Sequence, residues 1–204
     1  MFTGLVREFG EVLGFQQNIL TLKTKHRPKI GDSIAVNGAC LTAIEIFNNG
    51  FSVELSEETQ SHIALESYQG LVHIEPALRL QDRLDGHLVQ GHIDGIGKII
   101  KIIPHAIGID FFITTNRDIL ALCIPKGSIA INGISLTINE VLDDSLRLTL
   151  IPHTIQNTLF GQYSVGTKVN IETDMFARMV QHFLSNKKDS NLTWEKVDRI
   201  LGSY

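Results

Sequence analysis

The stretch that decides the fold occurs twice, as SIAVNGACLTAIE at residues 33–45 and as SIAINGISLTINE at residues 128–140. The copies are identical at eight of their thirteen positions, and most of the other positions exchange one apolar residue for another. The Asn-Gly pair inside each copy favours a tight turn, because both residues tolerate a positive φ. Each copy therefore predicts a β-hairpin.

Shorter similarities extend the repeat on both sides of the hairpins. Residues 2–6 resemble residues 89–93 at an offset of 87, the hairpins match at an offset of 95, and residues 72–75 match residues 169–172 at an offset of 97. The change from 87 to 95 means that the second copy carries eight extra residues ahead of its hairpin. Two long copies do not fit a solenoid array, so the repeat predicts two similar domains of roughly 90 residues.

Short alternating segments surround each hairpin and give about six strands per copy. The expected strands are residues 1–12, 19–24, 33–36, 40–47, 51–55 and 71–75 in the first copy, and residues 98–103, 109–114, 129–131, 136–141, 146–150 and 168–172 in the second. Residues 56–68 and 116–123 are less periodic and favour a short helix each. Six short strands with Gly- and Asn-rich turns predict a small closed antiparallel barrel, because closure leaves no exposed edge. We therefore expect an all-β protein with barrels at residues 1–85 and 86–173.

The sequence changes its period after Asp174. Apolar residues then recur at helical spacing at Phe176, Met179, Val180, Phe183 and Leu184. Asp174 is suited to cap the helix that this pattern predicts. We expect residues 174–204 to form a helical tail, with a further short helix at residues 193–201. The apolar stripe must pack either on the chain's own barrel or against other copies of the chain, and the sequence leaves both open.

The composition is that of an ordinary globular protein. The 204 residues are 43% hydrophobic and 20% charged, with a formal net charge of −4 and a pI of about 6.0. No block of lysine and arginine suggests a nucleic-acid partner, and no apolar run approaches the roughly 20 residues that span a bilayer. Arg7 and Glu8 interrupt any signal-peptide pattern. Two cysteines give no disulfide framework, so we expect a cytoplasmic protein.

A small polar residue follows the tip of each hairpin. Cys40 in the first copy becomes Ser135 in the second, and Thr42 and Thr137 follow two residues later. Alternate residues of a strand share a face, so each hairpin presents two polar groups on one side. A requirement for a small residue after a tight turn is the plainer explanation, and it stays open.

Two histidines, His87 and His92, stand ahead of the strands of the second copy. Their spacing fits neither a helix face nor a strand face and no third ligand lies nearby, so we expect no metal site. His92 stands where the first copy has Leu5, which makes it a candidate for proton transfer. Lys126, ahead of the second hairpin, is either a solvated lysine or a ligand contact.

The duplication itself suggests two similar ligands. If the reaction joins two identical molecules, a doubled pocket removes the entropy cost of bringing them together. The differences between Cys40 and Ser135, and between Leu5 and His92, would then give one ligand the donor role and the other the acceptor role.

Four motifs together resemble the riboflavin synthase family of the alpha-chain type: MFTGLV at residues 1–6, NGACLT at 37–42, GHLVQGH at 86–92 and GISLT at 133–137. The resemblance implies two tandem six-stranded Greek-key closed barrels and a C-terminal helix. It implies the conversion of two 6,7-dimethyl-8-ribityllumazine molecules into riboflavin and a pyrimidinedione by four-carbon transfer, the last step of riboflavin biosynthesis, without cofactor or metal. It also implies homotrimers that form through the C-terminal helices, with each site between the N-terminal barrel of one subunit and the C-terminal barrel of another. An association with lumazine synthase stays open.

The same resemblance, carried over residue by residue, places substrate contacts in segments around both hairpins. These residues are Phe2, Thr3, Gly4, Leu5, Val6, Cys40, Leu41, Thr42, Glu54, Leu55, Ser56, Glu57, Glu58, Thr59, Gly91, His92, Ile93, Lys126, Ser135, Leu136, Thr137, Ile151, Pro152, His153, Thr154, Ile155 and Gln156. The catalytic candidates are Ser135 and Thr137, which would stabilise the anion of the acidic 7-methyl group, together with His92 for proton transfer. Cys40 and Thr42 would hold the second molecule, and the group that adds at its C7 stays open.

Two positions depart from the family pattern. Asp85 stands where the family often has a glycine, and Asn132 stands where some members have an aspartate, so no general base is expected there. The main alternative is a non-catalytic lumazine-binding antenna protein, which shares the double barrel. Such proteins tend to lack the paired histidines and the C-terminal helix, both of which this chain has.

Overall fold

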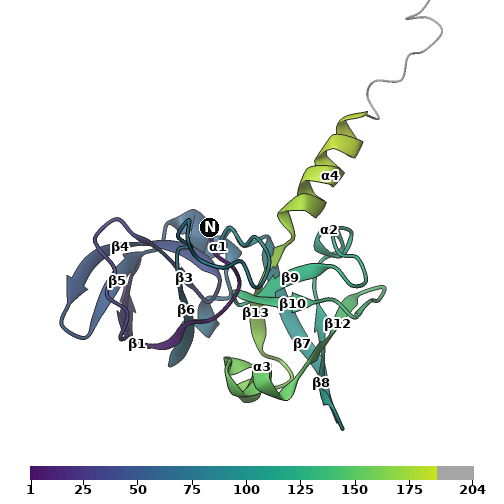
Figure 1. The fold of residues 1–204 in the computed structure, drawn as a ribbon, viewed down its shortest axis with the longest axis horizontal. Helices are drawn as coiled ribbons and strands as arrows, with labels where there is room; N and C mark the ends of the chain where they lie inside the picture. The colour runs from purple at the N-terminus through teal and green to yellow at the C-terminus, as the bar shows by residue number, and fades with distance from the viewer. Residues whose placement is uncertain (188–204) are drawn as a thin grey trace, which may run out of the picture.

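The computed structural model describes residues 1–187 of the chain (Figure 1). Two β units lie side by side, and the helix α4 (Met175–Lys187) projects away from the second unit. This arrangement confirms the expected all-β fold with a helix at its end. The further short helix expected at residues 193–201 lies outside the described residues.

The first unit is a closed antiparallel barrel with the strand order β1-β2-β5-β4-β3-β6. Its strands are β1 (Glu8–Gln16), β2 (Ile19–Lys23), β3 (Ser33–Val36), β4 (Ala39–Phe47), β5 (Gly50–Glu54) and β6 (Leu71–Pro76). Side chains of β4 alternate between the core and the outer surface, as the pleat of a strand requires. Leu41 and Ala43 are buried in the barrel core, whereas Cys40 is half-buried and Thr42 is exposed. The hairpin therefore presents Cys40 and Thr42 on the outside of the barrel.

The second unit is a curled sheet with the order β10-β9-β13-β7-β8-β12-β11. Its strands are β7 (Gly95–His105), β8 (Gly108–Thr114), β9 (Ser128–Ile131), β10 (Ile134–Thr137), β11 (Glu140–Val141), β12 (Ser145–Leu150) and β13 (Lys168–Thr173). β10 and β11, at the two ends of this order, are consecutive pieces of the stretch that corresponds to β4. The strand expected at residues 136–141 is thus split in two, and the unit has seven strands instead of six.

The break in the second unit falls at Ile138 and Asn139. The Ile138 side chain is buried in the core, and the side-chain oxygen of Asn139 accepts a hydrogen bond of 2.7 Å from the Thr149 N–H of β12. The first barrel has only a register shift here, between Ala43 and Glu45. In the second unit, the Asn139 side chain therefore makes a link to the neighbouring strand that the first unit makes through backbone pairing.

The eight extra residues of the second copy are spread over three elements. β7 and β8 are each two residues longer than β1 and β2, and the loop at residues 115–127 is four residues longer than the loop at residues 24–32. The longer loop contains α2 (Arg117–Leu120), which Asn116 caps by accepting a bond of 2.8 Å from the Ile119 N–H. α2 lies within the short helix expected at residues 116–123.

The strand expected at residues 1–12 is wrong in its first half, because β1 begins only at Glu8. Phe2 pairs instead with Val89 of the second unit through two backbone hydrogen bonds, with N···O distances of 2.7 and 3.1 Å. Both side chains are buried in a small apolar cluster with Ala35 and Ala130, one from each unit. The leading segment of each unit therefore runs across to the other unit.

His73 on β6 joins the first unit to the second. Its Nδ1 lies 3.1 Å from the Asn132 carbonyl oxygen, and its Nε2 accepts a bond of 2.8 Å from the Leu159 N–H. Burial lowers the pKa of His73 to about 4, so the ring is neutral at pH 7. A neutral ring with its hydrogen on Nδ1 satisfies both bonds.

Asn170 on β13 stands at the position equivalent to His73 and joins the second unit to the first. Its side-chain amide donates to the Asn37 carbonyl at 2.8 Å and accepts from the Ala64 N–H at 2.7 Å. Between these two contacts the hairpin tips meet at Gly38 and Gly133, with φ values of +85° and +79°. A Cβ on Gly38 would lie 2.6 Å from the Gly133 nitrogen, so this approach requires glycine.

The helix α4 leaves its apolar stripe uncovered by the rest of residues 1–187. The five stripe residues are each between 45% and 62% exposed: Phe176, Met179, Val180, Phe183 and Leu184. A groove of about 720 Å³ lies between this helix and residues 121–128. Docking of the stripe on the chain's own barrel, one of the two expected arrangements, is not what the structure shows. Within the described residues, no helix is long and apolar enough to cross a membrane.

Candidate functional site

Each hairpin is covered by the leading segment of the other unit. The Cys40 N–H donates to the Gly91 carbonyl at 2.9 Å, and the Ser135 N–H donates to the Gly4 carbonyl at 2.8 Å. Both glycines have positive φ, and a Cβ on either would lie within 2.6 Å of the Cβ of the hairpin residue that it covers. Glycine at these two positions therefore allows the segment to lie directly on the residue that follows the hairpin tip.

Two buried glutamates hold the crossing segments in equivalent ways. Glu172 accepts bonds of 2.7 and 2.8 Å from the backbone N–H groups of residues 90–91. Glu75 accepts bonds of 2.7 and 3.1 Å from those of residues 3–4. Burial raises the pKa of both carboxyls, that of Glu172 to about 7, against the opposing effect of these hydrogen bonds. The position of each segment therefore depends on one carboxylate.

A cavity of about 310 Å³ lies beside Cys40, between the first hairpin, the crossing segment and α1 (Glu57–His62). The predicted contact residues that line it are Cys40, Glu58, Thr59, Gly91, His92 and Ile93. Ala39, His62 and Ile63 also line it and were not predicted. Ser56 accepts a bond of 3.1 Å from the Thr59 N–H and so caps α1, whose first turn holds Glu57 and Glu58.

Six other residues predicted in the first unit fall into two groups. Thr42 and Glu54 lie opposite one another in the β4–β5 register, and both are exposed beside the hairpin. Four others are buried, with the side chains of Leu41 and Leu55 in the barrel core: Phe2, Thr3, Leu41 and Leu55. The buried group can offer a ligand only its backbone.

Ser135 lies against a histidine that sequence reasoning did not select. The Nδ1 atom of His87 is 2.7 Å from the Ser135 hydroxyl oxygen. Burial lowers the pKa of His87, while the Asp174 carboxylate acts in the opposite direction. Its Nε2 is buried without a hydrogen-bond partner among residues 1–187. When the neutral ring carries its hydrogen on Nε2, Nδ1 accepts a hydrogen bond from the Ser135 hydroxyl.

The structure therefore pairs the candidate residues differently from the sequence analysis. His92 was grouped with Ser135, because both belong to the second copy, but His92 lines the cavity of Cys40. The leading segments cross between the units, so the segment with Gly4 and half-buried Leu5 covers Ser135. His87, from the same unit as Ser135, contacts its hydroxyl. The only sequence signal for His87 was its place in the same motif as His92.

The other residues predicted in the second unit lie around the second hairpin and after β12. Thr137 is exposed opposite Ser128 in the β9–β10 register, and Leu136 and Val6 pack against the core of this unit. Lys126 is exposed in the turn before β9, with a φ of +67°. Its backbone N–H donates to the Ile138 carbonyl, while the structure describes no contact between its side chain and Ser135.

The helix α3 (Pro152–Gln156) follows β12 as α1 follows β5, and it contains the predicted contact residues Pro152, His153, Thr154, Ile155 and Gln156. Ile151 precedes it in extended conformation without a side-chain cap, unlike Ser56 at α1. Ile155 packs against the core of the second unit, so it is not free to contact a ligand through its whole side chain. The two helices thus share a place in the repeat but not a capping residue.

Comparison with known proteins gives matches over nearly the whole chain. The family model of the lumazine binding domain matches twice, at residues 3–77 and 90–174. The riboflavin synthase of Actinobacillus pleuropneumoniae is 36% identical over 196 residues, covering 92% of this chain and 91% of that protein. The riboflavin synthase of Bacillus subtilis is 34% identical over 208 residues, covering 98% and 96%. LumP, solved in complex with riboflavin, superposes with a TM-score of 0.75 at 21% identity, over 85% of this chain and 99% of that one. The last similarity shows a shared fold.

Proposed function

Since this chain belongs to the riboflavin synthase family, within the lumazine-binding domain proteins, we propose that it converts two molecules of 6,7-dimethyl-8-ribityllumazine into riboflavin and a pyrimidinedione. In this reaction a four-carbon unit leaves one molecule and joins its twin, so the enzyme is a transferase. The two substrates supply and accept the unit themselves, and no cofactor is needed. We assign residues 1–85 and 86–173 to the two lumazine-binding units.

The observation that carries the proposal is the doubled arrangement of hairpin, covering segment and glutamate. Each unit presents a polar residue after the hairpin tip, Cys40 or Ser135, under a glycine of the crossing segment. The two places share their backbone contacts, so they can hold two copies of one ligand. Their side chains differ, so the two copies can play different chemical roles.

We assign deprotonation of the donor substrate to the second hairpin. The 7-methyl group of the lumazine is acidic because its anion delocalises into the ring, and hydrogen-bond donors fixed beside that anion stabilise it. The Ser135 oxygen can take the proton that leaves the methyl group while its own hydroxyl proton passes to neutral His87, 2.7 Å away. The hydroxyl of Ser135 then carries the methyl proton and, with that of Thr137, can donate a hydrogen bond to the anion. At the first hairpin, Cys40, Thr42 and His92 would hold the acceptor molecule.

The shape of the Cys40 cavity supports a site that a second subunit completes. Its volume of about 310 Å³ is at the lower limit of the range usual for small-molecule sites, and it opens on the outer face of the barrel. The exposed stripe of α4 needs a partner surface, because five large apolar side chains on one helix face are costly in water. We therefore propose a homotrimer that forms through residues 174–204, in which the first unit of one subunit faces the second unit of another.

The test is turnover without additives. Purified protein mixed with the lumazine alone should produce riboflavin, followed by its absorbance near neutral pH, and the particle mass in solution should equal three chains. Tight binding of the lumazine without any riboflavin would contradict the proposed reaction and support the binding-only alternative. A fully active monomer would contradict the shared site while leaving the reaction in place.

A further inference from the structure

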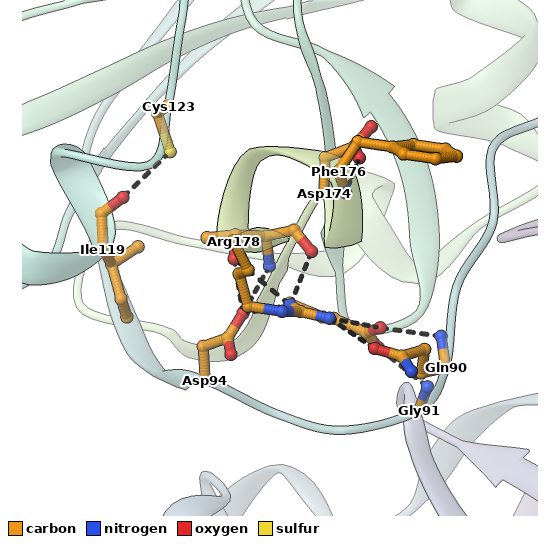
Figure 2. Close-up of polar contacts among 10 residues, drawn as sticks. Gln90, Gly91, Asp94, Ile119, Cys123, Asp174, Phe176 and Arg178 are labelled. Carbon is orange, nitrogen blue, oxygen red and sulfur yellow. Dashed lines mark hydrogen bonds and ion pairs between the residues drawn. The ribbon is translucent and has the colours of Figure 1, made fainter. Parts of the chain in front are cut away.

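One arginine fastens both ends of the segment that carries His92 (Figure 2). Arg178 Nη2 donates to the side-chain oxygen of Gln90 at 2.6 Å, and Nη1 donates to a carboxylate oxygen of Asp94 at 2.7 Å. Residues 90 and 94 are the two ends of the segment, with His92 at its centre. The arginine side chain is 23% exposed, so these bonds are partly shielded from water and each is worth more than a surface contact.

The same guanidinium is fixed on its own side as well. Nη1 also donates to the Thr173 carbonyl at 2.7 Å, and the Asp94 carboxylate accepts bonds of 2.7 and 2.6 Å from the Thr173 N–H and hydroxyl. The Glu172 carboxylate, which holds residues 90–91, lies 3.8 Å from Nη2. The segment, the end of β13 and the start of α4 therefore form one hydrogen-bonded unit around Arg178.

Within residues 1–187, no helix residue fastens the segment that covers Ser135 in this way. Asp94 corresponds to Arg7 at the offset of 87, and Arg7 lies near enough to Glu75 to lower the pKa of that carboxyl against the effect of burial. The cation next to the first glutamate thus belongs to the crossing segment itself. In the second unit the segment contributes an anion, Asp94, and the balancing cation comes from α4.

We infer that Arg178 is a positioning residue, which holds residues 90–94 against the first hairpin and so sets the place of His92 in the Cys40 cavity. The inference rests on the proposed function only where it concerns turnover. It also makes α4 a part of the site's support, because the residue that fastens the segment lies in the first turn of that helix. A shift of α4 moves the contacts at both ends of the segment.

Loss of the guanidinium has a defined electrostatic consequence. Asp94 and Glu172 are then two neighbouring carboxylates without the Arg178 cation between them, and they repel each other. Asp94 raises the pKa of Glu172 and Arg178 lowers it, so removal of the arginine raises the pKa of Glu172 further. A protonated Glu172 has one fewer acceptor for the N–H groups of residues 90–91, and the segment loosens at neutral pH.

The first experiment measures the segment without using catalysis. In a Cys123→Ser background, the rate at which a thiol reagent labels Cys40 reports how firmly Gly91 lies on it. Arg178→Gln should raise this rate by about tenfold, because a loosened segment uncovers the thiol. Arg178→Lys should give a smaller increase, since a lysine reaches only one end of the segment. Arg7→Gln is the matched control beside Glu75, and it should leave the rate within twofold of the parent.

The second experiment measures turnover. Arg178→Gln should lower kcat by about 10- to 100-fold, because a displaced His92 no longer holds the acceptor molecule in the right position relative to the donor. The acid limb of the pH–kcat profile should move to higher pH in Arg178→Gln and should stay in place in Arg7→Gln. Arg178→Lys should recover part of the activity.

The inference is overturned if Arg178→Gln labels at Cys40 and turns over at the parental rates, or if Arg7→Gln has the same effects. If Arg178→Gln does not fold, Gln90→Met decides, because it removes one end contact without touching α4; parental labelling in that variant overturns the inference. An inactive parent chain would count against the proposed reaction alone, since the labelling experiment still tests Arg178.

Discussion

The segment that covers Cys40 is fastened at both ends by an arginine of α4, whereas the segment that covers Ser135 needs no residue from that helix. The backbone contacts of the two segments are nevertheless equivalent, down to the glutamate that holds each one and the glycine that lies on each hairpin. The duplication has therefore kept the hydrogen bonds of the backbone and changed the side chains around them. This separation allows one scaffold to hold two identical ligands and treat them differently.

The largest expected effect tests whether the hairpins differ in chemistry. Ser135→Ala should lower kcat by about 100-fold, because it removes a donor fixed beside the developing anion and the partner of His87. Cys40→Ser makes the first hairpin like the second, and it should cost less than about tenfold, since a hydroxyl still holds the acceptor. Single-turnover rates of riboflavin formation measure both.

The midpoint of thermal unfolding is the control for these two variants and should stay near that of the parent chain. Equal losses of the single-turnover rate in the two variants would contradict the proposed difference in role between the units. An unchanged rate in Ser135→Ala would remove Ser135 from the mechanism.

The next effect concerns the two side chains that join the units. Burial lowers the pKa of His73 from 6.5 to about 4. Between these pH values His73 is protonated in the unfolded chain and neutral in the folded chain. The contribution of neutral His73 to the free energy of unfolding is fully present above pH 6.5. It is lost as the pH falls towards 4, and the loss amounts to about 3 kcal/mol. His73→Asn, which copies Asn170, should remove most of this acid sensitivity.

Free energies of unfolding in urea at pH 7 and pH 4.5 measure the difference. The reciprocal variant, Asn170→His, should make the chain more sensitive to acid than the parent, because it adds a second buried ring at the equivalent place. The same pH dependence in the parent and in His73→Asn would show that other groups govern acid unfolding.

The smallest expected effect concerns the split strand of the second unit. Asn139→Ala removes the acceptor of the Thr149 N–H and should lower stability by about 1 kcal/mol. Hydrogen exchange should quicken at the Thr149 amide and stay unchanged at the Glu54 amide, which lies at the equivalent place in the unbroken barrel. Unchanged exchange at Thr149 would mean that the side chain contributes nothing to closing the sheet.

Much of the fold could be predicted from the repeat alone. Asn37-Gly38 and its counterpart set the hairpins, and alternation along residues 39–43 placed Cys40 and Thr42 on one face. These signals are local, because turn residues and strand periodicity act within a few positions. The apolar spacing after Asp174 gave α4 for the same reason.

The pairings of the site could not be predicted in this way. Phe2 is apolar whether it continues β1 or crosses to Val89, so the pattern at residues 1–12 favoured one long strand. With the crossing unknown, His92 was grouped by copy with Ser135, and His87 was passed over. Arg178 gave no signal, because its partners at residues 90 and 94 are more than eighty positions away.

The exchange of leading segments has a consequence for the history of the chain. A single-unit ancestor with this plan would have placed its first residues on a twin molecule, as swapped dimers do, because neither hairpin is covered by its own unit. Gene fusion would have turned that mutual exchange into an internal one without altering its geometry. After the fusion, a mutation changed one unit and not the other. The single ancestral position could then become Cys40 in the first unit and Ser135 in the second.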